Sequence, residues 1–145
     1  MSSVEERLQA LEDREAIRAL LTAYRRALDE KEFEAYADLF GDDGEFVTDG
    51  RSVRGRAEIL AMLAELQAEG ALSVAAGDDR HLVTNVEIAV DGDRATALST
   101  WVYLTRGPGD QPQLSLVGHY EDSLRRTAAG WRFARRAAPC DIPLP

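Results

Sequence analysis

The chain has 145 residues, 45% of them hydrophobic and 30% charged, a balance typical of one folded globular domain and unlike that of a disordered protein. Its formal net charge of −9 repels phosphate backbones, which argues against nucleic acid as a partner. No apolar run approaches the roughly 20 residues that span a membrane, so we expect no membrane partner. The N-terminus lacks a signal-peptide pattern, so we expect a cytoplasmic location. The single cysteine, Cys140, also fits that location.

Residues 4–29 are predicted to form one long amphipathic helix. Its apolar and aromatic side chains recur at spacings of three and four and form one stripe: Ile17, Leu20, Leu21, Tyr24 and Leu28. Tyr24 lies in the middle of that stripe, either as a core aromatic or as a pocket residue. Asp29 lies well off the stripe, so the helical period predicts a solvated carboxylate, although a tilted helix end could still present it to a cavity.

A shorter helix is predicted over residues 33–40, ended by the turn residues Gly41-Asp42-Asp43-Gly44. A short strand over 45–48 and a return strand over 51–53 come next, joined by a tight turn. A third helix follows over residues 57–68, and a loop rich in Ala, Gly and Asp leads to residue 80.

From residue 80 onward the apolar period changes from helical to alternating, which predicts strands. Strict alternation over 80–90 would place Leu82 on one face with Val86, Ile88 and Val90, and His81 on the other. The histidine is one of only two in the chain, and its unperturbed pKa of about 6.5 suits a proton carrier. A hydrogen-bonded structural histidine is the competing interpretation.

Three more strands are predicted over 94–106, 113–126 and 131–137, followed by an irregular tail that contains Pro139, Pro143 and Pro145. The order of elements indicates an α+β fold, in which helices cover one face of a curved antiparallel sheet. Such a sheet closed by helices forms a cone that can hold a ligand. Trp101 and Tyr103 share one strand face, and either line that cavity or belong to an ordinary core.

Several motifs accompany this order of elements: Tyr24-x4-Asp29, His81 followed by Asn85, the Asp91-Gly92-Asp93 hairpin, and Gly118-x-Tyr120-x-Asp122 before Gly130-Trp131-Arg132-Phe133-x-x-Arg136. Together they resemble the SnoaL-like branch of the NTF2-like superfamily over about residues 8–137. The resemblance implies an NTF2-like cone, a curved and mostly antiparallel sheet covered by three helices, as a single domain over residues 1–145.

Within that superfamily the spacing is most similar to scytalone dehydratase, bile-acid 7α-dehydratase and hexachlorocyclohexane dehydrochlorinase. The resemblance implies that His81 is a general base and that Asp29 orients it, which reverses the solvated interpretation of Asp29. It further implies a catalytic Tyr24 and an Arg136 that stabilises a departing anion.

Four aromatic residues are expected to bind the substrate: Phe46, Trp101, Tyr103 and Tyr120. The second histidine of scytalone dehydratase has no counterpart here, because its position falls near Tyr103 or Thr105. His119 alternates with Gly118 and Tyr120, so it is expected to face away from the cavity.

The expected function is a cofactor-independent lyase, such as a dehydratase, or an isomerase that acts on a small apolar ring or a steroid-like molecule. The alternatives are a non-catalytic ligand-binding or dimerisation module of the same fold, or a polyketide cyclase-type enzyme. No metal site is expected, since the two histidines lie on separate strands. A homodimer or higher homo-oligomer is implied by the resemblance alone.

Overall fold

The computed structural model describes residues 2–142. Its elements follow in the order α1 (Val4–Asp29), α2 (Phe33–Ala37), β1 (Phe40–Thr48), β2 (Arg51–Arg54), α3 (Arg56–Ala68), β3 (Asp79–Asp91), β4 (Arg94–Arg106), η1 (Pro108–Asp110), β5 (Pro112–Thr127), β6 (Gly130–Ala137) and β7 (Cys140–Ile142). The order confirms the predicted α+β plan of helices followed by a long meander.

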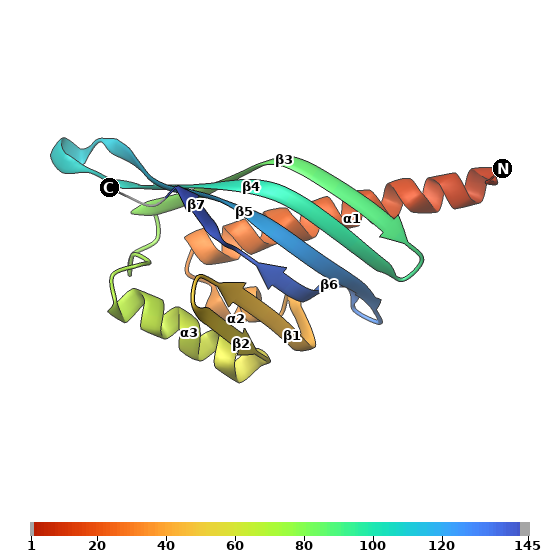
Figure 1. Cartoon of the computed structure of the whole chain (residues 1–145), viewed down its shortest axis with the longest axis horizontal. Helices are drawn as coiled ribbons and strands as arrows, with labels where there is room; N and C mark the ends of the chain where they lie inside the picture. Colours follow the sequence, from red (N-terminus) through yellow and green to blue (C-terminus); the bar gives the residue numbers. More distant parts are fainter. Residues whose placement is uncertain (1, 143–145) are drawn as a thin grey trace.

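The strands form one sheet in the spatial order β2-β1-β6-β5-β4-β3, and β7 pairs with β5 beyond this path. Neighbouring strands are antiparallel except β1 and β6, which run parallel. The long strands β3, β4 and β5 bend over α1, and α2 and α3 lie on the same side of the sheet (Figure 1). The curved sheet and the helices therefore enclose the core between them.

Helix α1 begins with a capping box, in which the Ser3 side chain accepts from the backbone of Glu6 and the Glu6 carboxylate accepts from the backbone of Ser3. Its predicted stripe is buried, and Tyr24 is only 2% exposed. The helix ends at Asp29, and Lys31 follows with a positive φ of 61°. This left-handed residue turns the chain sharply toward α2, so the end of α1 meets the start of β3.

A β-bulge in β3 corrects the predicted facing of that strand. The register shifts between Thr84 and Glu87, where Asn85 adopts a positive φ of 54°. The extra residue moves the inward-facing set by one position. His81 therefore lies on the same, inner face as Val86, and Leu82 is 52% exposed on the outer face. The expected grouping of Leu82 with the later valines and isoleucine was wrong for this reason.

The predicted turn over Gly41–Gly44 is also corrected, because these residues belong to strand β1. The pairing of β1 with β6 shifts between Phe40 and Glu45, which accommodates the glycine-rich segment as an irregular strand. A Cβ at position 44 would lie 2.8 Å from the Phe40 Cβ, so glycine permits this close approach.

The tail is more regular than predicted, because Cys140–Ile142 form β7 against β5. Pro139 precedes this strand as expected for a residue that ends pairing. Pro143 and Pro145 lie outside the described residues. None of the helices within residues 2–142 is long and apolar enough to cross a membrane.

Candidate functional site

A cavity of about 150 Å³ lies between the inner face of the sheet and the helices α1, α2 and α3. Most of its wall is apolar, and the four aromatic residues expected to bind substrate all line it: Phe46, Trp101, Tyr103 and Tyr120. Its polar side chains are Tyr24, Tyr36, Thr48 and His81 in addition to the tyrosines of that set. The predicted base and the predicted aromatic wall thus meet at one cavity.

His81 contacts Asp29 across the junction of α1 and β3. The imidazole Nδ1 lies 2.7 Å from Asp29 Oδ1, and the backbone N–H of His81 donates to the same carboxylate at 3.1 and 3.2 Å. The Asp29 side chain is fully buried and that of His81 is 10% exposed. With the carboxylate accepting from Nδ1–H, the neutral imidazole carries its lone pair on Nε2.

Arg25 is a second partner of Asp29. Its Nη1 lies 3.2 Å from Asp29 Oδ2, one helical turn earlier on α1. The guanidinium binds in addition to the imidazole rather than replacing it, since the two contacts use different carboxylate oxygens. Asp29 therefore holds its orientation through donors from both its own helix and β3.

Asp79 is a buried carboxylate that the sequence analysis missed. It accepts from the Tyr103 hydroxyl at 2.6 Å, from Lys31 Nζ at 2.7 Å and from the Ser73 backbone at 2.9 Å. Burial opposes its ionisation, but these donors outweigh burial and lower the pKa of Asp79. The alternation of β3 offered a signal, because a residue two before His81 faces the same side.

Tyr103 lies between Asp79 and His81 and lines the cavity. Its ring stacks on the His81 imidazole with 4.6 Å between centroids. Burial and the Asp79 carboxylate both raise the pKa of the phenol, so the phenol stays protonated and donates a hydrogen bond to Asp79. A second acceptor, the carbonyl of Ala71, lies 3.2 Å from the same hydroxyl. The phenol oxygen can therefore only accept from a ligand.

Tyr24 and Tyr36 form a buried pair, with the Tyr36 hydroxyl donating to the Tyr24 hydroxyl at 2.9 Å. Burial raises the pKa of both phenols, so both stay protonated. Because the Tyr24 hydroxyl accepts from Tyr36, its own O–H can donate a hydrogen bond to a ligand, and it is a stronger donor than a lone phenol. Tyr36 lies within the predicted second helix, and the fold brings its hydroxyl to this pair.

Arg136 is fully buried but is not among the residues that line the cavity. Its guanidinium binds Asp122 through Nε at 2.8 Å and Nη2 at 3.1 Å. It also lies over the rings of Tyr120 and Tyr24, at 3.5 and 4.1 Å from their centroids. The expectation that Arg136 stabilises a departing anion is therefore not supported by its position, because two tyrosine rings cover the cation.

Trp101 is held in the cavity wall by its neighbour on β5. A Cβ at Gly118 would lie 2.2 Å from the Trp101 ring and 2.3 Å from the carbonyl of Pro139, so only glycine leaves room there. The indole Nε1 also donates to the His119 carbonyl at 3.0 Å. Glycine at position 118 thus fixes one wall of the cavity.

The remaining predicted positions lie away from the cavity. His119 binds Asp141 through Nδ1 at 2.8 Å, and its side chain is 38% exposed. Hydrogen bonding to Asp141 raises its pKa. Trp131 packs in the core and donates to Asp13 at 3.3 Å.

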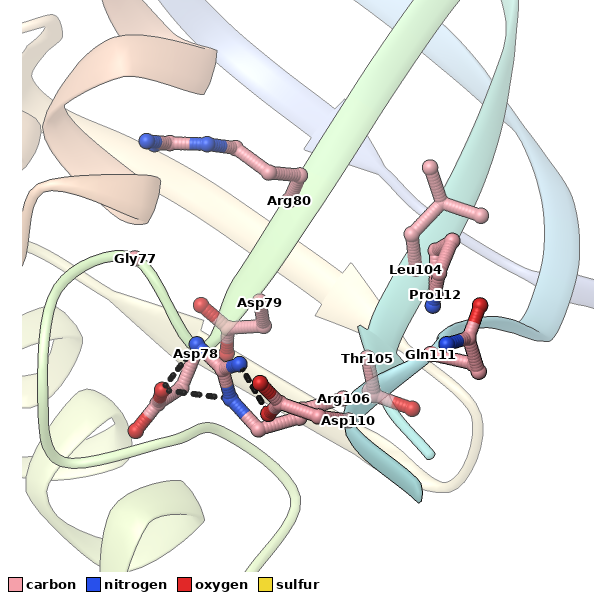
Figure 2. Close-up of a pocket in the computed structure, with 10 residues that line it drawn as sticks. All are labelled: Gly77, Asp78, Asp79, Arg80, Leu104, Thr105, Arg106, Asp110, Gln111 and Pro112. Atoms are coloured by element: carbon pink, nitrogen blue, oxygen red, sulfur yellow. Dashed lines mark hydrogen bonds and ion pairs between the residues drawn. The ribbon is translucent and has the colours of Figure 1, made fainter. Parts of the chain in front are cut away.

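A second hollow, of about 240 Å³, lies where β3 begins and β4 ends (Figure 2). Its charged side chains pair with one another, since Arg106 binds both Asp78 and Asp110. Arg80 points away from this group and pairs with Glu30. Among the described residues that line this hollow, no unpaired charge or nucleophile supplies a chemistry.

No group of three or more His, Cys, Asp or Glu side chains within residues 2–142 is arranged to hold a metal ion. The carboxylates near the cavity are already bound to cations or imidazole, as described for Asp29 and Asp79.

A family model described as the SnoaL-like domain matches residues 9–137. Among curated proteins, none matches the chain. Among solved structures, an NTF2-like protein with a cystatin-like fold from Novosphingobium aromaticivorans is 31% identical, with a TM-score of 0.81. The alignment covers 97% of this chain and 92% of that protein.

Two further structures are similar in sequence and fold. A single-residue variant of Rv3472, a protein of unknown function from Mycobacterium tuberculosis, is 29% identical, with a TM-score of 0.79 over 97% of this chain and 77% of that one. A Catenulispora acidiphila protein in complex with S-DNPA is 28% identical, with a TM-score of 0.77 over 92% of this chain and 95% of that one.

Proposed function

Because the chain belongs to the SnoaL-like domain family, of the NTF2-like fold, we propose that it is a small-molecule enzyme, a cofactor-independent lyase or isomerase. The observation that carries this proposal is the 2.7 Å contact between His81 and the fully buried Asp29 at the cavity wall. Burying a carboxylate costs free energy unless the carboxylate is paired and hydrogen-bonded. A pocket that only binds an apolar ligand does not need such a pair. The proposal is therefore general-base catalysis at His81.

In the proposed reaction, His81 Nε2 removes a proton from a ring carbon beside a carbonyl, and the electron pair moves toward the neighbouring carbon. The bond from that carbon to its hydroxyl oxygen breaks, Tyr24 donates a hydrogen bond to the departing oxygen, and His81 returns its proton to that oxygen so that the group departs as water. Asp29 stabilises the imidazolium formed by the transfer. An isomerase would use the same base and return the proton to another carbon.

The position of Arg136 favours water over halide as the leaving group. A halide leaves as an anion and needs a cation beside it, whereas a protonated hydroxyl leaves as a neutral molecule. The guanidinium is bound by Asp122 and covered by tyrosine rings, so the described residues offer no free arginine in the cavity wall. Dehydration thus fits the described wall better than dehydrohalogenation.

Turnover of a panel of cyclic β-hydroxy-carbonyl compounds and halogenated rings by the purified protein tests the proposal. We expect activity on the hydroxy-carbonyl set and a loss of about 10²–10⁴-fold in His81→Ala. His119→Ala is the matched control, since the other histidine pairs with Asp141 away from the cavity. Equal turnover by the wild type and His81→Ala would rule out the proposed base, and no turnover of any panel compound would leave a ligand-binding module as the function.

Self-association is a separate proposal. Three leucines on the outer face of the sheet are at least half exposed: Leu82, Leu98 and Leu114. An apolar outer face supports the homodimer that the resemblance implies.

A further inference from the structure

The cavity is small for the range of ligands that the resemblance allows. Its volume is about 150 Å³, and a cavity of similar volume in another protein holds one benzene molecule. A fused steroid would need several times that space. The size of the cavity therefore selects for a single ring.

The walls that set this size are anchored rather than free to move. Trp101 is wedged above Gly118 and hydrogen-bonded through its indole nitrogen. Tyr103 is tied to Asp79, and Tyr120 lies against the buried guanidinium of Arg136. Each of these side chains would lose a hydrogen bond or a cation–π contact if it turned away to admit a larger ligand.

The polar atoms of the wall define the chemistry of that ring. His81 Nε2 and the Tyr103 hydroxyl oxygen both act as acceptors, because their neighbouring protons are held by Asp29 and Asp79. Two acceptors in the lining favour a ligand that donates, such as a hydroxyl group. The Tyr24–Tyr36 pair supplies a donor to the same cavity.

The cavity also lacks a partner for a charged ligand among the described residues. Its lining contains no lysine or arginine, since Lys31 is held by Asp79 and Arg136 by Asp122 behind the wall. A carboxylate on the ring would lose its hydration and gain no cation in return.

We propose that the ligand of this site is a neutral, hydroxylated single-ring molecule, such as a phenol or a cyclic hydroxy-ketone. This inference rests on the proposed function for the identity of the site, but it concerns binding and can be tested without turnover. It narrows the expected substrate class by removing steroid-like molecules.

The test is a titration of the wild-type protein with phenol, toluene, benzoate and 2-naphthol, followed by the NMR signals of the two indole N–H groups. Trp101 lines the cavity and Trp131 does not, so phenol should shift the first signal saturably and leave the second in place. We expect toluene, benzoate and 2-naphthol to bind at least about tenfold more weakly than phenol. No saturable shift with phenol would overturn the inference, as would equal or tighter binding of 2-naphthol, toluene or benzoate.

A pair of variants separates cavity size from general effects on α3. Leu66 lines the cavity, whereas Leu60 is partly buried on the same helix away from it. Leu66→Ala should strengthen 2-naphthol binding about tenfold or more relative to phenol, and Leu60→Ala should leave the ratio unchanged. Equal ratios in both variants would show that the cavity does not set the ring size.

The outcomes distinguish this inference from the proposed function. Phenol binding with no turnover of any panel compound would remove the enzyme proposal and keep the ring-size inference. Turnover of a steroid or a fused-ring substrate through His81 would keep the enzyme proposal and remove the ring-size inference.

Discussion

At the scale of single residues, two carboxylates connect the end of α1 to the start of β3, and one acceptor lies on the helix and the other on the strand. Asp29 on the helix accepts from His81 on the strand, and Asp79 on the strand accepts from Lys31 just after the helix. Each contact spans about fifty residues of sequence, so it forms only when the fold brings the two segments together. The same junction thus positions both His81 and Tyr103.

The pKa of Asp79 makes its contribution to stability dependent on pH. Because hydrogen bonds lower that pKa in the folded state, the stabilisation is present above the unfolded pKa of about 3.9 and is lost as pH falls through the folded pKa. We expect Asp79→Asn to reduce the free energy of unfolding by about 1–3 kcal/mol at pH 7. The difference from the wild type should shrink at acidic pH, as measured by urea unfolding at both pH values.

Asp78→Asn is the matched control, since the neighbouring carboxylate is 45% exposed and pairs with Arg106 at the surface. It should cost no more than about 0.5 kcal/mol at either pH. A constant difference between Asp79→Asn and the wild type across the pH range would contradict a charged Asp79.

At the scale of elements, the bulge in β3 decides which residues face the cavity. Without the extra residue, a strand that turned His81 inward would turn Val86 outward, and the rest of the strand with it. The left-handed conformation of Asn85 absorbs the insertion, and asparagine tolerates that conformation better than most residues. One residue therefore reconciles a polar site at the start of the strand with an apolar core at its end.

The positive φ at the bulge restricts which residue types position 85 tolerates, and this restriction can be tested. Asn85→Val should lower the free energy of unfolding by about 1–2 kcal/mol, because a β-branched side chain is strained at positive φ. Asn85→Gly should be close to neutral. Thr84→Val, at a neighbouring exposed position with no positive φ, is the control, and an equal effect of both valines in chemical denaturation would argue against the bulge.

At the scale of the whole molecule, a buried ion pair lies at the centre of the core. Arg136 and Asp122 are both fully buried, and the guanidinium is surrounded by aromatic rings from α1, β5 and β6. Within residues 2–142 no acceptor contacts its Nη1. A charge at this depth is tolerated only with its partner in place.

Removing one member of the Arg136–Asp122 pair should therefore lower the free energy of unfolding strongly. Asp122→Asn leaves the guanidinium without a counter-charge, and we expect it to cost about 3–5 kcal/mol in thermal or denaturant unfolding. That is a large part of the roughly 5–15 kcal/mol that stabilises a typical domain. The double variant Asp122→Leu with Arg136→Met should recover most of the loss.

Asp93→Asn serves as the comparison, because Asp93 pairs with Arg126 while 79% exposed. It should cost about 0.5 kcal/mol or less. A similar cost for Asp122→Asn would mean that the buried pair contributes little.

The order of elements and the α+β fold could be predicted from the sequence. Amphipathic periods located α1 and α3, and the strand alternation, with the family motifs, identified the SnoaL-like domain. Six of the predicted site residues line the cavity: Tyr24, Phe46, His81, Trp101, Tyr103 and Tyr120. These features follow from local periodicity and local spacing, which a linear sequence records directly.

Which of those residues are available to a ligand depends on contacts in the tertiary structure. Helical period placed Asp29 in solvent, but the packing of a helix end against a strand buries it completely. The bulge at Asn85, the cover of tyrosine rings over Arg136 and the bond between Asp79 and Tyr103 likewise depend on contacts between distant segments. Burial and hydrogen bonding are properties of neighbours in space, so sequence periodicity alone does not determine them.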